Sequence, residues 1–297
     1  MAIPETELQT WSGQGSAAGS ATAYNSVKAA IDASTALASR SIEVYLQGSY
    51  RNSTNIRGDS DVDVVVQSDA TFYHDLDRLA PAVKESVRAS FAPATYLWDQ
   101  FREDVRLALI DYYGAGAIID KSKCITVINP GSSGINADVV PSFTHRFYLQ
   151  GSSVAPYHID DIAFKTQREG RLVVNFPKRH YERGVEKNRN TAEEFKPTVR
   201  VFKNARSYLV EHGGLGDAVA PSYFLECMLF NVGDSEFSGA NWQEQFGKVF
   251  SFLDGADLTS FLCQNGMVAL FGDTPEQWEE SQAREFLRRV AELWNSW

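Results

Sequence analysis

The feature that most constrains this chain is a pair of aspartates inside a short apolar run. Asp61 and Asp63 belong to the stretch "DVDVVV", whose valines predict a β-strand. Side chains alternate between the two faces of a strand, so both carboxylates leave it on the same side. Two carboxylates on one face repel each other unless a cation lies between them. The spacing therefore predicts a metal-binding site on this strand.

A Gly-Ser pair precedes the first aspartate by about a dozen residues. Gly48 and Ser49 directly follow the apolar run "EVYL", which also predicts a strand, and the residues between the two runs are typical of a turn or a short helix start. Glycine lets the backbone approach a phosphate closely, and a serine hydroxyl with free backbone N–H groups can hold that phosphate. The pair is therefore a candidate phosphate-binding turn.

A third acid stands alone in a later predicted strand. Asp138 is the single acidic residue in "INADVVPSF", and an isolated acid among apolar strand residues is costly unless it is paired or bound to a metal. Sites for phosphoryl transfer commonly hold two Mg²⁺ ions about 4 Å apart with carboxylate oxygens. We therefore predict that Asp61, Asp63 and Asp138 are catalytic and bind two Mg²⁺ ions, with Mn²⁺ as an alternative.

Charge is unevenly distributed along the chain. The formal net charge of −10 argues against a protein that holds long nucleic acid by broad phosphate neutralisation. Between residues 165 and 206, however, twelve Lys and Arg stand against five Glu, a local balance of +7. A confined basic segment of this kind suits one polyphosphate better than a duplex.

Cysteine usage and hydropathy indicate the compartment. The three cysteines, Cys124, Cys227 and Cys263, are far apart, so no disulfide framework and no zinc-binding spacing is visible. No apolar run approaches the roughly 18–20 residues that span a bilayer, and the first residues lack the order of a signal peptide. The sequence predicts a cytoplasmic protein with no membrane partner.

Secondary-structure signals change character along the chain. Residues 1–20 are small and polar and are expected to be frayed at their start, and apolar residues at helical spacing over about 20–36 predict a long N-terminal helix. Strands then alternate with helices up to a hairpin over 159–177, and the rest is mostly helical. Thr274 and Gln277 form a capping-box pattern at the start of the last helix. We predict an α+β fold with a mixed sheet in residues 1–180 and a helical lobe in residues 181–297.

The order of Gly-Ser, Asp-x-Asp and a later single Asp resembles the nucleotidyltransferase superfamily of DNA polymerase β. The strings "GSYRNSTNIRGDSDVDVVV", "FKPTVRVFKNARSYL" and "PSYFLECMLFNV" resemble the bacterial CD-NTases, relatives of cyclic GMP–AMP synthase and oligoadenylate synthetase, over about residues 40–235. The resemblance implies a bilobal polymerase β-like core and a C-terminal lobe like that of oligoadenylate synthetase. No Cys/His cluster forms the zinc module of the animal cyclase, so DNA-length sensing by that module is not expected.

The resemblance also implies roles for single residues. The three aspartates would form the metal triad, and the Gly-Ser pair would contact phosphate through Ser49. Lys203 in "VFKNAR" and Ser222 in "PSYF" would contact the triphosphate of the donor nucleotide, and Tyr223 would stack on a nucleobase. Asn175 in "VVNFP", whose amide both donates and accepts hydrogen bonds, is a candidate reader of the base.

The leading interpretation is an enzyme that joins ribonucleoside triphosphates, ATP and a second NTP, into a cyclic di- or trinucleotide signal of antiphage defence (CBASS). Regulatory or effector proteins of a defence operon would be its partners, and pyrophosphate would leave. A nucleotidyltransferase that adds one nucleotide to a protein, a tRNA or a small molecule is the alternative, but it usually lacks the helical-lobe match. A linear oligonucleotide synthase would need a basic track continuing outward, and the last 44 residues carry eight acids against three arginines. A catalytically silent binding module of the same fold is disfavoured because all three acids are present.

Overall fold

The computed structural model describes residues 2–58, 61–150 and 156–297, which form two compact units. The first, the α/β unit, comprises Ala17–Gln47 and Ser60–Lys178. The second, the helical unit, comprises Met1–Ser16, Gly48–Asp59 and Arg179–Trp297. Two N-terminal segments thus belong with the C-terminal helices, whereas the predicted division at residue 180 places them with the sheet; that division stays a prediction.

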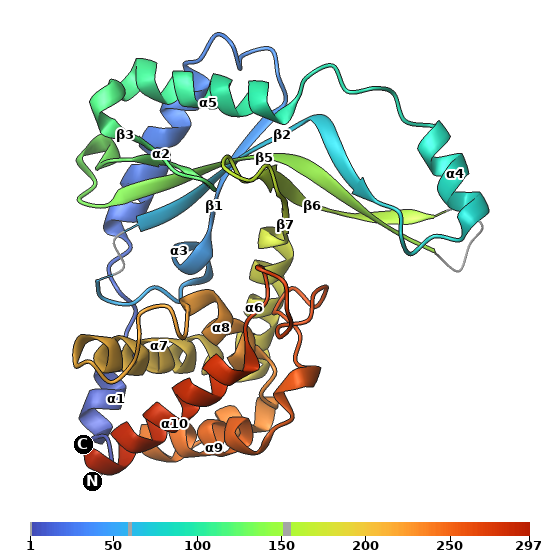
Figure 1. Cartoon of the computed structure of the whole chain (residues 1–297). Helices are drawn as coiled ribbons and strands as arrows, with labels where there is room; N and C mark the ends of the chain where they lie inside the picture. Colours follow the sequence, from blue (N-terminus) through green and yellow to red (C-terminus); the bar gives the residue numbers. More distant parts are fainter. Residues whose placement is uncertain (1, 59–60, 151–155) are drawn as a thin grey trace. The chain divides into compact units, whose positions relative to one another are not determined.

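Within the described residues, the α/β unit contains one seven-stranded sheet with helices packed against it (Figure 1). The strands are β1 (Ile42–Gln47), β2 (Asp61–Asp75), β3 (Ile118–Asp120), β4 (Ile125–Val127), β5 (Asn136–Leu149), β6 (Tyr157–Lys165) and β7 (Leu172–Asn175). The helices are α2 (Ala18–Asp32), α4 (Pro81–Ala89) and α5 (Trp98–Tyr113), with short 3₁₀ turns at Ala115–Ala117 and Pro130–Ser132.

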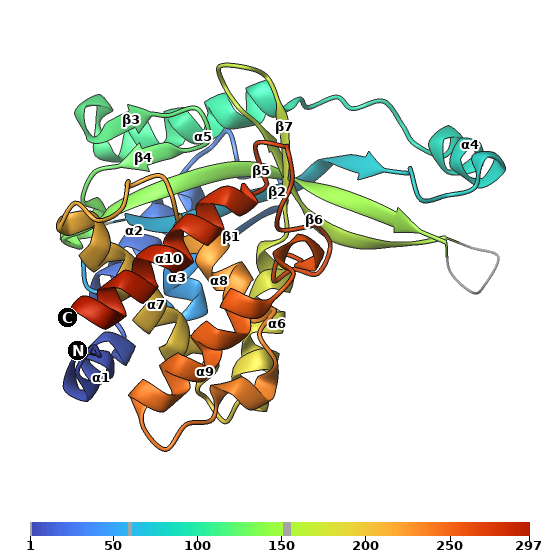
Figure 2. The same ribbon diagram turned by 60° about the horizontal axis from the view of Figure 1, so that its bottom comes forward.

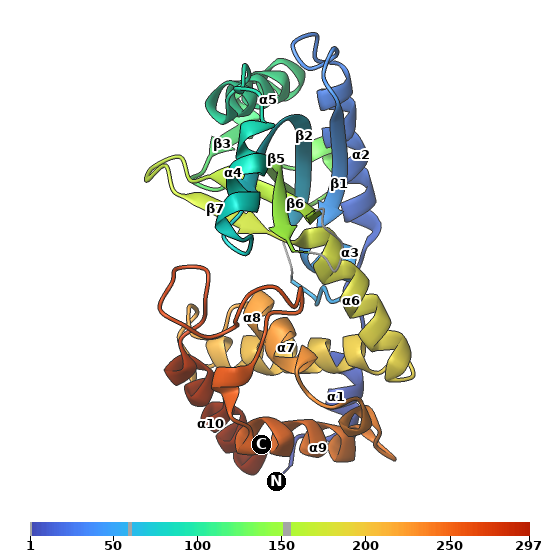
Figure 3. The same ribbon diagram turned by 90° about the vertical axis from the view of Figure 1, so that its right-hand side faces the viewer.

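Strand β5 organises the sheet because it pairs along both of its edges. It runs parallel to β2 on one edge, while β4 pairs antiparallel with its first residues and β6 pairs antiparallel with its second half. Strand β1 lies beside β2 (Figure 3) and is antiparallel to it. Strand β3 is antiparallel to β4, and β7 is antiparallel to β6. The predicted α+β fold with a mixed sheet is confirmed, and so is the predicted hairpin, which is β6–β7.

Side-chain alternation along β2 separates buried valines from partly exposed aspartates. Val62 and Val64 are fully buried, whereas Asp61 and Asp63 between and beside them keep partial exposure. Helices α2 and α5 pack against each other and against the sheet, and α5 contributes Phe101, whose ring stacks on Phe143 of β5 at a centroid distance of 5.2 Å. Val62 and Val64 therefore belong to the core, and the two acids lie on the opposite side of the strand with partial exposure.

The helical unit is built from seven α-helices among the described residues (Figure 2). They are α1 (Glu5–Ser12), α3 (Gly48–Asn52), α6 (Pro177–Asn190), α7 (Phe195–Glu211), α8 (Ser222–Phe230), α9 (Trp242–Gly255) and α10 (Glu280–Ser296). Short 3₁₀ turns lie at Asp234–Phe237 and Leu258–Ser260, and α6 begins two residues before the unit boundary. None of the helices in the described ranges combines the length and the apolar character that crossing a membrane requires.

Two predicted features of the helical unit are wrong in their details. Residues 5–12 are not frayed, because they form α1, which buries Leu8 completely and Trp11 to 8% exposure against α7. Helix α10 begins at Glu280 and not at the predicted capping box, although the Thr274 and Gln277 side chains do form a hydrogen bond of 3.0 Å. Trp278 is 1% exposed and its backbone N–H donates to the Leu270 carbonyl, so its burial holds this segment in a turn outside the helix.

Candidate functional site

The α/β unit brings the three predicted aspartates onto adjacent strands. Asp63 of β2 and Asp138 of β5 are register partners in the parallel pair, and Asp61 is the partner of Asn136. Register partners in a sheet point to the same face, so the three carboxylates share one face of β2 and β5. The Asn136 amide donates to Asp61 Oδ1 at 3.2 Å.

Asp138 has two polar neighbours that sequence reasoning missed. The Lys121 ammonium lies 3.2 Å from Asp138 Oδ1, and the Thr126 hydroxyl donates to the same oxygen. Partial burial opposes ionisation of Lys121, but the Asp138 carboxylate raises the pKa of this ammonium above its usual value. Thr126 is the register partner of Asp138 on β4, so only the strand pairing, and no pattern in "KSKCITVI", identifies it.

The donor chemistry of this face fits a hard divalent cation. The three carboxylates supply oxygen ligands, which are the ligands that Mg²⁺ prefers. Across residues 2–58, 61–150 and 156–297, however, no group of three or more His, Cys, Asp or Glu side chains is close enough together to hold a metal ion. Asp138 is turned toward Lys121 and Thr126, so a cation at this face would have to compete with the lysine ammonium for that carboxylate.

Asn175 lies at the end of β7 in the same unit. Its amide nitrogen donates to Gln47 Oε1 at 3.4 Å, and its amide oxygen accepts from the backbone N–H of Phe176 at 2.9 Å. The side chain is partly exposed. The role of Asn175 in recognising the nucleobase stays a prediction.

The Gly-Ser turn belongs to the helical unit. Gly48 directly follows β1 and has a φ of +69°, a left-handed conformation that favours glycine. The Ser49 carbonyl accepts from the backbone N–H of Thr54 at 2.9 Å, which closes the segment into a compact turn. The glycine is therefore required by the backbone at this position.

Helix α8 carries the two other predicted nucleotide contacts at its start. Ser222 and Tyr223 are both exposed, and 40% of Tyr223 is accessible. The Tyr223 ring stacks on His180 of α6 with a centroid distance of 5.4 Å and an interplanar angle of 25°. An exposed aromatic ring supported from behind is an arrangement suited to stacking on a nucleobase.

Lys203 is buried, unlike a lysine on the solvated surface of a helix. It lies on α7, is 1% exposed, and its ammonium donates to the backbone carbonyl of Thr54 at 2.8 Å. Its predicted contact with the donor triphosphate stays a prediction. The structure shows that this lysine stabilises the segment that follows the Gly-Ser turn.

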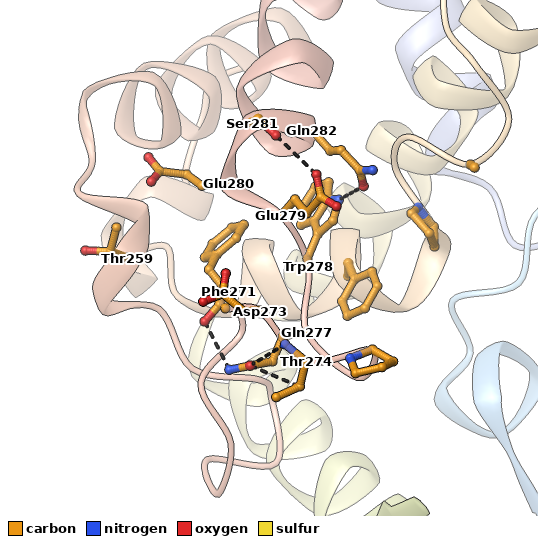
Figure 4. Close-up of a pocket in the computed structure, with 15 residues that line it drawn as sticks. Thr259, Phe271, Asp273, Thr274, Gln277, Trp278, Glu279, Glu280, Ser281 and Gln282 are labelled. Atoms are coloured by element: carbon orange, nitrogen blue, oxygen red, sulfur yellow. Dashed lines mark hydrogen bonds between the residues drawn. The ribbon is translucent and has the colours of Figure 1, made fainter. Parts of the chain in front are cut away.

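A cavity of about 920 Å³ opens elsewhere in the helical unit (Figure 4). Phe271 and Trp278 stack in its wall with centroids 5.6 Å apart. Asp273, Glu279 and Glu280 are its charged lining residues, and no Lys, Arg or His lines it among the described residues. Its negative charge makes it unsuitable for a triphosphate.

The acid-bearing sheet and the helical unit define a nucleotidyltransferase. Residues 32–111 match the nucleotidyltransferase domain family, and residues 182–295 match the family described as the cGAS/DncV-like nucleotidyltransferase C-terminal helical domain. The chain belongs to the CD-NTases, the family of cyclic nucleotide synthases that includes cGAS- and DncV-like enzymes. Members of the nucleotidyltransferase family generally use divalent metal ions.

Curated relatives match the whole length of the chain. The cyclic UMP-AMP synthase of Rhodothermus marinus is 45% identical over 297 residues, covering 100% of this chain and 99% of that protein. The cyclic nucleotide synthase CdnE01 of Staphylococcus haemolyticus is 35% identical over 100% of both chains. Both therefore cover the sheet and the helices together.

Solved structures show the same fold. The Rhodothermus marinus CdnE c-UMP-AMP synthase with Apcpp and Upnpp superposes with a TM-score of 0.90 at 45% identity, covering 99% of this chain and 97% of that one. The Elizabethkingia meningoseptica CdnE cyclic dinucleotide synthase with GTP and Apcpp gives a TM-score of 0.77 at 27% identity, covering 98% of each chain. The family resemblance read from the sequence is confirmed.

Proposed function

We propose that this enzyme joins two ribonucleoside triphosphates into a cyclic dinucleotide by a two-metal mechanism that releases pyrophosphate. The observation that supports this most strongly is the register of Asp63 with Asp138 on parallel strands, which gathers the acids of a family metal triad on one face. Cyclic UMP–AMP, named for the relative at 45% identity, is the first product to look for. Relatives at 31–34% identity are named for dipyrimidine and dipurine products, so base choice varies within the family.

The chemistry consists of two successive phosphoryl transfers. In the first, the 3′-hydroxyl of one nucleotide loses its proton near Asp138 and attacks the α-phosphate of the other in line; an O–P bond forms, and the bond to pyrophosphate breaks. The linear intermediate then reorients, and the second transfer closes the ring and releases a second pyrophosphate. Two Mg²⁺ ions held by Asp61, Asp63 and Asp138 would neutralise the charge of the triphosphate.

Residues of the helical unit would bind and orient the nucleotides. Ser49 in the Gly-Ser turn and Ser222 at the start of α8 are the proposed phosphate contacts, and Tyr223 is the proposed base-stacking residue. Lys203 is proposed to contribute positive charge toward the triphosphate. In the α/β unit, Asn175 is proposed to read the base through its amide.

The product would act as a signal to an effector protein of a defence operon, as the family resemblance implies. The experiment that tests the enzymatic proposal is incubation with the four ribonucleotides and Mg²⁺, followed by mass spectrometry. A cyclic dinucleotide supports the proposal. Transfer of a single nucleotide to an added protein or tRNA, with no nucleotide–nucleotide product, would instead favour the alternative class.

A further inference from the structure

Thr54 connects the Gly-Ser turn to the interior of the helical unit through each of its polar groups. It is 0% exposed. Its N–H donates to the Ser49 carbonyl at 2.9 Å, and its hydroxyl donates to Glu226 Oε2 at 2.8 Å. Its carbonyl accepts from the Lys203 ammonium at 2.8 Å. The turn that carries Ser49 is therefore fixed by contacts with α7 and α8.

Glu226 is the acceptor on which these contacts converge. The residue is 4% exposed, and besides Thr54 its carboxylate accepts from the Asn52 amide at 3.1 Å and from His180 Nε2 at 3.0 Å. Burial by itself raises the pKa of Glu226, but His180 and Lys203 outweigh it and hold this pKa below its usual value. The buried group is therefore an ionised carboxylate with both oxygens engaged.

The same carboxylate is also linked through His180 to Tyr223, another proposed nucleotide contact. Glu226 lies four residues after Ser222 and three after Tyr223 on α8, so the three side chains share one side of the helix. His180, which donates to Glu226, is the ring on which Tyr223 stacks. The Glu226 carboxylate thus contacts both the segment that follows Ser49 and the His180 ring on which Tyr223 stacks.

A purely structural role would not need a charge here. Apolar residues of similar volume commonly hold such a segment as firmly as a buried ionic network does, because removing charges from water is costly. Hydrogen bonds differ from apolar contacts in fixing direction and register as well as proximity. The network is therefore suited to fixing the direction and register of the turn.

We propose that Glu226 is a positioning residue that sets the Ser49 turn against the start of α8, so that both triphosphate contacts are presented to one nucleotide. This inference rests on the proposed function, because it takes Ser49 and Ser222 as phosphate contacts. It assigns Asn52, Thr54 and His180 to the same task, and it gives Lys203 a positioning contact through Thr54.

The test replaces Glu226 with glutamine and measures nucleotide binding. Glu226→Gln keeps the shape of the side chain, but its NH₂ group cannot accept the bonds that one carboxylate oxygen accepts. The matched control is Thr198→Val in the same unit, which removes a hydroxyl that accepts from the Gln245 amide at 2.9 Å and donates to the Glu194 carbonyl at 2.7 Å, with neither partner in the Gly-Ser turn. Thr198 is 1% exposed, so both variants remove a buried polar contact.

We expect Glu226→Gln to raise the Kd of a non-hydrolysable ATP analogue in Mg²⁺ by about tenfold or more, and Thr198→Val to change it less than about twofold at a similar loss in Tm. Equal effects of the two variants on Kd would overturn the inference. Thr54→Val supplies a second test in combination with Glu226→Gln. If Glu226 acts on the turn through Thr54, the double variant should bind the analogue little worse than either single variant. If the loss of affinity in the double variant equals the product of the losses in the two single variants, the inference is also overturned. If the unmodified enzyme binds no triphosphate, the proposed function itself fails, which is a separate outcome.

Discussion

Asp63 and Asp138 are direct register partners on the parallel strands β2 and β5, although 75 residues separate them in the chain. The pairing brings two carboxylates side by side on one face, with Asp61 two residues along β2. Such a face is electrostatically unfavourable without a cation, and with bound cations it can stabilise the charge of phosphoryl transfer. The stability and the activity of variants that lack these charges therefore show whether the face binds a metal.

Replacing both acids of β2 should abolish activity without unfolding the protein. In Asp61→Ala with Asp63→Ala, two like charges leave one partly exposed face, so we expect a Tm equal to or above that of the unmodified protein and no nucleotide joining. Thermal unfolding and product formation are measured together. Asp160→Ala, on the exposed part of β6, is the control that should stay active. Product formation by the folded double variant would remove the metal-site argument.

Lys203 can be tested with two substitutions that differ in volume. Lys203→Met keeps most of the side-chain volume and leaves the Thr54 carbonyl without its donor, which we expect to cost about 1–3 kcal/mol in the free energy of unfolding. Lys203→Ala adds a cavity and should cost more. Both should raise the KM for ATP, because the turn and the charge near the triphosphate are affected together. An unchanged KM in the folded Met variant would make the residue purely structural.

The buried carboxylate of Glu226 predicts a pH dependence of stability. Its pKa in the folded protein lies below the usual 4.5, so its ionised form contributes stability that is present above pH 4.5 and is lost as the pH falls through the folded value. The unfolding free energy of the unmodified protein should thus fall more steeply with acid than that of Glu226→Gln. Urea unfolding of both proteins between pH 7 and pH 3.5 measures this. Parallel curves would show that Glu226 does not titrate as described.

The base-reading role of Asn175 predicts a change in selectivity. Its amide forms hydrogen bonds to Gln47 and to the backbone of Phe176, and both hydrogen bonds are only partly buried, so Asn175→Ala should lower Tm by little. We expect the ratio of the four nucleotides incorporated to change while total product is retained. Competition with all four NTPs and mass spectrometry reads this ratio. An unaltered ratio would assign base choice to other residues.

Local patterns in the sequence predict the acid face well. The alternation of "DVDVVV" places both acids on one side of a strand, which follows from residue order alone, and the isolated Asp138 indicates a third ligand on another strand. The hairpin at β6–β7 is equally local. The strand alternation and the hairpin depend on neighbours within a few residues, which the sequence displays directly, whereas the pairing of β2 with the strand that carries Asp138 joins residues 75 apart.

The polar interior of the helical unit does not follow from local patterns. Glu226 contacts Asn52 and Thr54 across 174 and 172 residues, and no spacing rule links them. Three cations of the basic segment 165–206, Lys187, Arg200 and Lys203, are buried on carbonyl oxygens and do not add to its surface charge, which a residue count does not reveal. Composition counts charges, but tertiary packing decides which of them remain accessible.

The most direct test of the account is the form of the product. The protein is incubated with the four ribonucleotides, α-labelled, and Mg²⁺, and the products are treated with phosphatase before mass spectrometry. If the enzyme makes a cyclic dinucleotide, one dominant product has that mass and resists phosphatase, because a ring has no terminal phosphate. A ladder of phosphatase-sensitive linear oligomers would contradict the proposed function.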